Sequence, residues 1–147
     1  MSRRTRTTLI LLLLVAVMYA VTYLTERDSS EGSAPDGDVY TLLDEAFRTG
    51  RSDFVVEIEG VVQRILPDDR EGSQHQRFVL ELPTAQTLLV SHNIDLAQRV
   101  PITAGDRVGL RGEYEWNDRG GVIHWTHHDP RGRREGGWIQ FDGAIYE

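Results

Sequence analysis

From residue 53 onward, apolar and polar residues alternate with a period of two, which restricts most of the chain to β-strands. In the first segment Phe54, Val56 and Ile58 alternate with polar residues, and Gly60 interrupts the pattern where a bulge or bend is expected. The alternation returns at 78–82, 87–90, 107–116 and 121–128, and a short apolar segment follows at 138–141. The sequence therefore predicts five to six short strands.

The connections between these segments favour a particular fold. Residues 94–101 show no alternation and predict a helical turn or an ordered loop. The stretch 105–112, with Gly105, Asp106, Val108 and Gly112, is similar to the GD-x-V-x-x-x-G start of the fourth strand in many OB-folds. We expect an all-β domain at 52–147, a small five-to-six-stranded OB-like Greek-key barrel. An SH3-like barrel or an open β-sandwich is the alternative.

Two segments of different character precede the strands. At 39–51 the apolar residues fall on one helical face and Gly50 suits a helix end, which predicts a short amphipathic helix. Residues 26–38 are rich in Ser, Gly, Pro and acidic residues, which predicts a flexible linker.

The first 25 residues predict attachment to a membrane as one transmembrane helix. Arg3, Arg4 and Arg6 precede an uncharged run at 7–25, which would span about 28 Å as a helix, close to the hydrocarbon thickness of a bilayer. The arginines favour a cytoplasmic N-terminus, so we expect a single-pass membrane protein whose remaining chain is exported. A cleaved signal peptide and a secreted domain are the alternative, although Met18 suits the −3 position of cleavage after Ala20 poorly.

Composition excludes several kinds of chemistry. The chain has no Cys, and all 16 of its Lys and Arg residues are Arg, so disulfides, thiolate nucleophiles and Schiff-base lysines are absent. Beyond Arg6, 13 arginines face 23 acidic residues. This balance argues against nucleic acid as a partner, because proteins that bind it neutralise phosphates with basic side chains.

The segment 107–128 predicts a β-hairpin whose turn lies at 117–120. The register that keeps the apolar residues of both strands on one face includes the pairs Tyr114–Ile123, Glu113–His124, Gly112–Trp125 and Leu110–His127. The tryptophans are expected in the core; exposed, they would stack on bases or sugars. Arg131, Arg133 and Arg134 form a basic patch that would capture an anion or polyanion, or else a solvated loop.

Three histidines close to this hairpin raise the question of a metal site. On a strand, His124 and His128 stand about 13 Å apart, so one zinc ion would need ligands from elsewhere in the chain. The metal candidates are His92, His124, His128 and Asp129. The simpler interpretation has no cofactor: Glu113 and His124 form a cross-strand pair, and the polar residues at 93 and 95 shape a turn by bonding the backbone.

Several sequence motifs resemble a functionally uncharacterised bacterial family of small exported proteins, a domain of unknown function. The motifs are HQRF at 75–78, HNIDLA at 92–97, GEYEWN at 112–117, GG at 120–121, HWTHHDP at 124–130 and GGW at 136–138. The resemblance covers roughly residues 54–146 and implies an exported bacterial domain. Together with the predicted anchor, it implies a single-pass protein of the bacterial inner membrane with a periplasmic domain. It implies no activity, cofactor or catalytic residue.

We therefore expect a noncatalytic binding or interaction module of the cell envelope, whose partner is an envelope protein or a small ligand. Its predicted binding surface is His75, His92, Asn93, Asp95, Glu113, His124, His127, His128 and Asp129. The rival hypothesis is a metal-dependent hydrolase that uses the His/Asp cluster. A third is binding of single-stranded nucleic acid or another polyanion on the barrel face.

Overall fold

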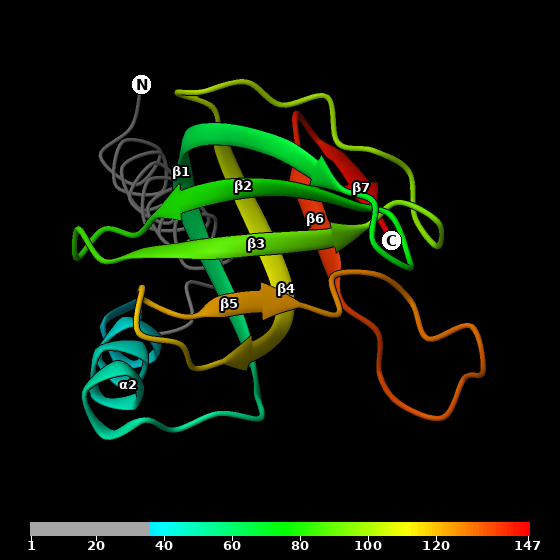
Figure 1. Cartoon of the computed structure of the whole chain (residues 1–147). Helices are drawn as coiled ribbons and strands as arrows, with labels where there is room; N and C mark the ends of the chain where they lie inside the picture. The colour runs from blue at the N-terminus through cyan, green and yellow to red at the C-terminus, as the bar shows by residue number, and fades with distance from the viewer. Residues whose placement is uncertain (1–35) are drawn as a thin grey trace, which may run out of the picture. The chain divides into compact units, whose positions relative to one another are not determined.

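The computed structural model of the chain describes residues 36–147, in which a helix precedes seven strands of one sheet (Figure 1). The elements are α2 (Asp36–Thr49), β1 (Phe54–Asp69), β2 (His75–Glu81), β3 (Thr87–Asn93), β4 (Arg107–Glu115), β5 (Val122–His124), β6 (Trp138–Phe141) and β7 (Ala144–Tyr146). The predicted anchor at 1–25 and most of the linker at 26–38 lie outside the described residues. Within 36–147, no helix is long and apolar enough to span a bilayer.

The strands follow the order β1-β2-β3-β5-β4-β6-β7, and β1 also pairs with β4. Residues 54–61 of β1 pair with β4, whereas residues 61–69 pair with β2. The pairings from β1 through β2, β3, β5 and β4 thus return to β1, and β3 with β5 is the parallel pair among them. In Figure 1, β2, β3 and β5 cross in front of β1, β4 and β6.

The long first strand changes partner where the sequence predicted an interruption. A Cβ added to Gly60 would lie 2.7 Å from both the Glu81 carbonyl oxygen and Leu80 Cγ, so β1 and β2 approach too closely there for any side chain. A register shift follows between Val62 and Arg64. Glycine at this position therefore lets β1 pair with β4 along its first half and with β2 along its second half.

Alternation along the strands builds the core as expected. Val56, Ile58 and Val62 of β1 are buried together with the inward residues of the other strands. Helix α2, predicted at 39–51, begins three residues earlier and ends at Thr49, and it adds Leu43 to this core. The hydroxyl of Tyr40 donates to the Glu59 carbonyl oxygen and accepts from the Glu59 amide, both at 3.1 Å. This side chain thus holds the helix against β1.

The β4–β5 hairpin confirms half of the predicted register and corrects the rest. Glu113 pairs with His124 and Tyr114 with Ile123 as expected. However, β5 ends at His124, because Trp125 has a positive φ of 54°, which no strand accommodates. The predicted pairs Gly112–Trp125 and Leu110–His127 are therefore wrong.

Strand β6 takes the place that the sequence assigned to the end of β5. Leu110 pairs with Ile139, so β6 continues along the same edge of β4. Residues 125–137 leave that edge and return to it, and we call them the excursion loop (Figure 1). A hydrogen bond of 2.9 Å from the Gly137 amide to the His127 carbonyl oxygen closes the loop at its base. Compact surface loops with adjacent ends are frequently functional.

Candidate functional site

The structure divides the predicted binding surface between two regions. Four of its residues lie at the ends of β2 and β3 and in the following turn, namely His75, His92, Asn93 and Asp95. The other five lie on the β4–β5 hairpin and the excursion loop, namely Glu113, His124, His127, His128 and Asp129. Most of these side chains form hydrogen bonds or ion pairs within the protein, so their first role is structural.

His92 joins the two regions. Its ring is fully buried; Nδ1 lies 2.8 Å from Thr126 Oγ1, and Nε2 lies 3.0 Å from the Gln98 carbonyl oxygen. Because a carbonyl oxygen only accepts, Nε2 carries the proton and the neutral ring accepts at Nδ1 from the Thr126 hydroxyl. Burial lowers the pKa of His92 below its usual 6.5, and the charge of His127 acts in the same direction. The ring is therefore a structural link between the 94–99 loop and the excursion loop.

The other residues near β3 shape the connection to β4. The Asn93 side-chain oxygen accepts from the Asp95 amide at 3.0 Å, and the Asp95 carboxylate accepts from the Gln74 amide at 2.8 Å. His75 Nδ1 contacts the Ser73 carbonyl oxygen at 2.9 Å. The turn-forming role that the sequence assigned to Asn93 and Asp95 is confirmed, and the connection is an ordered loop with a turn at 94–96.

A residue outside the predicted surface fixes the far end of this loop. The buried Gln76 amide donates to the Val100 carbonyl oxygen at 2.8 Å and accepts from the Val100 amide at 2.9 Å. Only the motif HQRF hinted at this residue, because in the sequence its alternation position looks like that of any core residue. His92 thus holds the 94–99 loop at Gln98, and Gln76 holds the chain at Val100, directly after it.

Asp129 organises the excursion loop. Its Oδ1 accepts from the Arg131 amide at 3.0 Å, and its Oδ2 accepts from the amides of Arg133 at 2.9 Å and Arg134 at 3.2 Å. These hydrogen bonds, that from Arg131 above all, lower the pKa of Asp129. Nearby, the buried His127 ring contacts the His128 carbonyl oxygen through Nδ1 at 2.8 Å. Both carboxylate oxygens of Asp129, a predicted metal ligand, are thus engaged with the backbone.

The charged residues beside the loop are also paired with one another. Glu113 forms an ion pair with Arg134, whose guanidinium lies 4.5 Å from the centre of the Trp125 ring. His124 Nε2 lies 3.9 Å from Glu113 and 3.6 Å from Glu115. In the predicted basic patch, the charge of Arg134 is therefore neutralised, while Arg131 and Arg133 remain exposed.

The predicted metal ligands do not converge. No three His, Asp or Glu side chains within residues 36–147 are arranged so that they could hold a metal ion. The set His92, His124, His128 and Asp129 is therefore not brought together in the part of the chain that the structure describes. The sequence could not show that these four residues lie apart, because their positions depend on the course of the excursion loop after His124.

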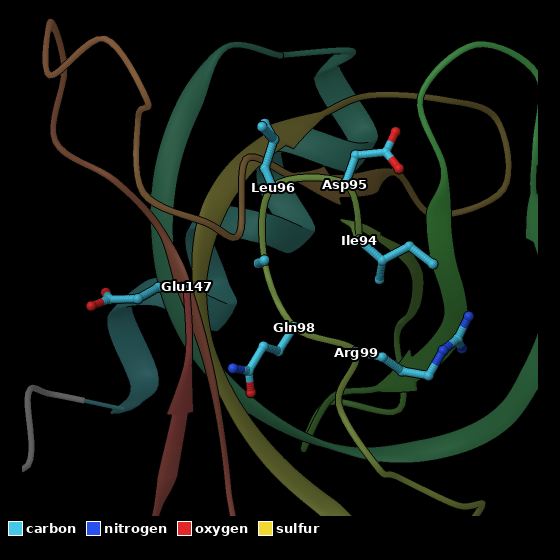
Figure 2. Close-up of a pocket in the computed structure, with 7 residues that line it drawn as sticks. Ile94, Asp95, Leu96, Gln98, Arg99 and Glu147 are labelled. Carbon is cyan, nitrogen blue, oxygen red and sulfur yellow. The ribbon is translucent and has the colours of Figure 1, made fainter.

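A hollow of about 620 Å³ lies beside the 94–99 loop and is also lined by Glu147 (Figure 2). Of the predicted surface residues, only Asp95 lines it; Leu96, Gln98 and Arg99 were missed. Figure 2 shows the side chains of Leu96 and Asp95 pointing away from the loop and that of Glu147 pointing outward. Arg99 forms an ion pair with Asp68 of β1. The only sequence signal for these residues is the loss of alternation at 94–101.

Comparison with known proteins identifies a family without adding an activity. The family model described as "Protein of unknown function (DUF3465)" matches residues 29–147, which extends well before the region of the resemblance seen in the sequence motifs. None of the curated proteins compared with the chain matches it. The chain therefore belongs to the DUF3465 family of proteins of unknown function.

Proposed function

We propose that this protein is a noncatalytic binding module of the bacterial cell envelope, held at the inner membrane by its N-terminal segment. The observation that carries the proposal is the hollow beside the 94–99 loop, whose backbone is held in place by buried polar side chains. A loop fixed before binding loses little conformational entropy when a partner binds, which is the advantage of a preorganised site.

The proposed fold is an OB-like Greek-key barrel. The circuit of pairings from β1 through β2, β3, β5 and β4 back to β1, with a parallel β3–β5 pair, supports it. The long first strand also supports it, because it changes partner from β4 to β2 near Gly60. Strands β6 and β7 extend this arrangement beyond β4. OB-folds bind diverse ligands, so the fold alone names none.

The composition of the hollow favours a protein partner over a small ligand. Ile94, Leu96 and Ala97 supply apolar surface, while Gln98 and Arg99 supply polar groups on the same short loop. Leu96 is 39% exposed, so its side chain is accessible to a partner. An outward-facing loop of mixed polarity suits a protein surface better than an enclosed small molecule.

The proposed location rests on the first 25 residues. Three arginines followed by an uncharged run of membrane-spanning length support an anchor with a cytoplasmic N-terminus. We expect an externally added protease to digest the domain in spheroplasts but not in intact cells. Mass spectrometry of the mature protein should find residues 1–20 present; their absence would replace the anchor by a cleaved signal peptide.

The rival hypotheses find less support in the geometry. A metal-dependent hydrolase needs free ligands, yet His92 and Asp129 are engaged with neighbouring groups. Binding of a nucleic acid or polyanion needs a cluster of accessible cations. Arg134 and Arg111 are paired with Glu113 and Glu135, which leaves two arginines of the predicted basic patch, Arg131 and Arg133, unpaired among residues 36–147.

Site-specific photocrosslinking of the full chain in its native cells tests the binding role. A photoreactive phenylalanine analogue at position 96 should give a discrete, light-dependent adduct with an envelope protein. The matched control is position 65, because Ile65 is 42% exposed on β1 and does not line the hollow. The adduct at position 96 should weaken in the Gln76→Ala variant, because this variant lacks the hydrogen bonds that hold the backbone at Val100, next to the loop. The same adducts at both positions, or none at 96, would overturn the proposal.

A further inference from the structure

A second, smaller depression lies on the outer face of β1, β4 and β6. Cross-strand pairing places two rows of outward residues there, Glu57–Arg111–Trp138 and Glu59–Gly109–Gln140. The intervening residues Ile58, Leu110 and Ile139 are buried in the core, which confirms that the rows face outward. The centre of the second row is therefore a glycine surrounded by larger side chains.

Gly109 forms the floor of a hollow of about 210 Å³. A Cβ added there would lie 3.7 Å from Trp138 Cζ3, 3.8 Å from Gln140 Oε1 and 3.8 Å from Glu59 Cγ, all ordinary contacts. Neither packing nor a positive φ requires glycine at this position. The missing side chain thus leaves space on the surface.

The polar groups around this space are unengaged. Among residues 36–147, the side chains of Glu59, Arg107, Gln140 and Asp142 have no hydrogen-bond or ion-pair partner. Glu59 and Arg107 lie diagonally across β1 and β4, where opposite charges commonly pair, and yet they form no ion pair. The indole N–H of Trp138 also has no acceptor within this part of the chain. Donors and acceptors therefore surround a small hollow, and the Trp138 ring lies beside the glycine at its centre.

We infer that this depression binds a single neutral pyranose ring within a polysaccharide. The hollow is smaller than the roughly 300–1,000 Å³ of sites for larger organic ligands, which suits one ring. Trp138, whose Cζ3 would lie 3.7 Å from a Cβ on Gly109, offers apolar surface to the ring carbons beside the hollow. The Glu59 carboxylate accepts from hydroxyls, the Arg107 guanidinium donates to them, and the Gln140 amide does both.

The charges around the hollow select a neutral ligand. Glu59 and Asp142 repel a phosphate or an acidic sugar, while Arg107 repels an amine. The site is distinct from the hollow beside the 94–99 loop and shares no lining residue with it. The two proposals therefore stand or fall separately.

Calorimetric titration of the full chain in lipid nanodiscs tests the inference. The neutral probes are maltotetraose and tetra-N-acetylchitotetraose, and nanodiscs replace sugar-based detergents that would compete. At least one probe should bind with a Kd of about 1 mM or lower. Gly109→Val, which fills the floor, should weaken binding by about tenfold or more, and Gln140→Ala by about threefold. Gly109→Ala provides a smaller filling of the same space if the valine variant is unstable.

Two controls separate binding in this depression from binding elsewhere on the protein. Arg119→Ala removes an exposed cation in the β4–β5 turn, away from the depression, and should leave the Kd unchanged. A deacetylated, cationic chitotetraose should bind more weakly than its neutral counterpart. The inference fails if neither neutral probe gives saturable heat up to about 10 mM. It also fails if folded Gly109→Val and Gly109→Ala keep the original Kd, or if the cationic probe binds best.

Discussion

The excursion loop and the Gly109 depression lie beside the same strand, β4, and treat their polar groups in opposite ways. In the loop, Asp129 binds three backbone amides and Glu113 pairs with Arg134. In the depression, Glu59, Arg107 and Gln140 have no partner among the described residues. A concentration of polar residues therefore does not identify a binding site by itself, because the side chains of one region are engaged with one another and those of the other are available to a ligand.

The excursion loop and the depression also differ in how much space surrounds their glycines. A Cβ on Gly137 would lie 2.0 Å from the Trp125 carbonyl oxygen and 2.3 Å from that of Arg111, so the base of the excursion loop closes only around glycine. Gly109 has ordinary contact distances around it and no such restriction. One glycine is required by packing, and the other leaves space open to solvent. Substitutions at these positions test the comparison directly.

The largest effect is expected at the base of the loop. Gly137→Ala should reduce the free energy of unfolding by at least about 3 kcal/mol, because two backbone carbonyls must move to admit the methyl group. Urea denaturation followed by far-ultraviolet circular dichroism measures this. A loss below about 1 kcal/mol would mean that the loop closes less tightly than the contact distances indicate.

A smaller effect is expected where His92 links the two loops. His92→Ala should cost about 2 kcal/mol of stability, because it removes the hydrogen bonds to Thr126 and Gln98 and leaves a cavity. The matched control is His128→Ala, which alters an exposed ring and should change stability by less than about 0.5 kcal/mol. Equal losses in the two variants would contradict the structural role of His92.

The same histidine predicts a pH dependence with a definite sign. Since its folded-state pKa is lowered, the unfolded chain binds its proton more readily. The contribution of His92 is fully present above its ordinary pKa of 6.5 and declines as pH falls below that value toward the folded-state pKa. Denaturation midpoints measured across this range should shift less with pH in His92→Ala than in the unaltered protein. An identical pH profile would show that another group is responsible.

The smallest effect is expected at the depression. Gly109→Ala should change stability by no more than about 0.5 kcal/mol, and in the stabilising direction, because alanine restricts the unfolded chain and its Cβ fits. Thermal unfolding of Gly109→Ala, Gly137→Ala and the unaltered protein, measured side by side, tests this difference in stability. A destabilisation of similar size in both variants would show that Gly109 is also a packing requirement.

The sequence by itself determined most of the strands and their inward-facing residues, because side chains alternate between the two faces of any extended backbone. The expectation that the tryptophans lie in the core was wrong, since Trp116 is 40% exposed and Trp125 and Trp138 are only partly buried. The sequence also predicted the interruption at Gly60 and the pairing of Glu113 with His124. It failed where the outcome depends on contacts between distant segments. Trp125 turns out of the strand, so Ile139 rather than His127 faces Leu110.

Only the tertiary structure decided which polar residues remain free to bind. His92 finds its partner 34 residues away in Thr126, and the depression combines Glu59, Gly109 and Gln140 from three strands. Residue type and spacing do not encode such meetings, because they depend on how β1, β4 and β6 align after the excursion loop. Local periodicity thus determined the elements, while the alignment of distant strands determined the surface they present.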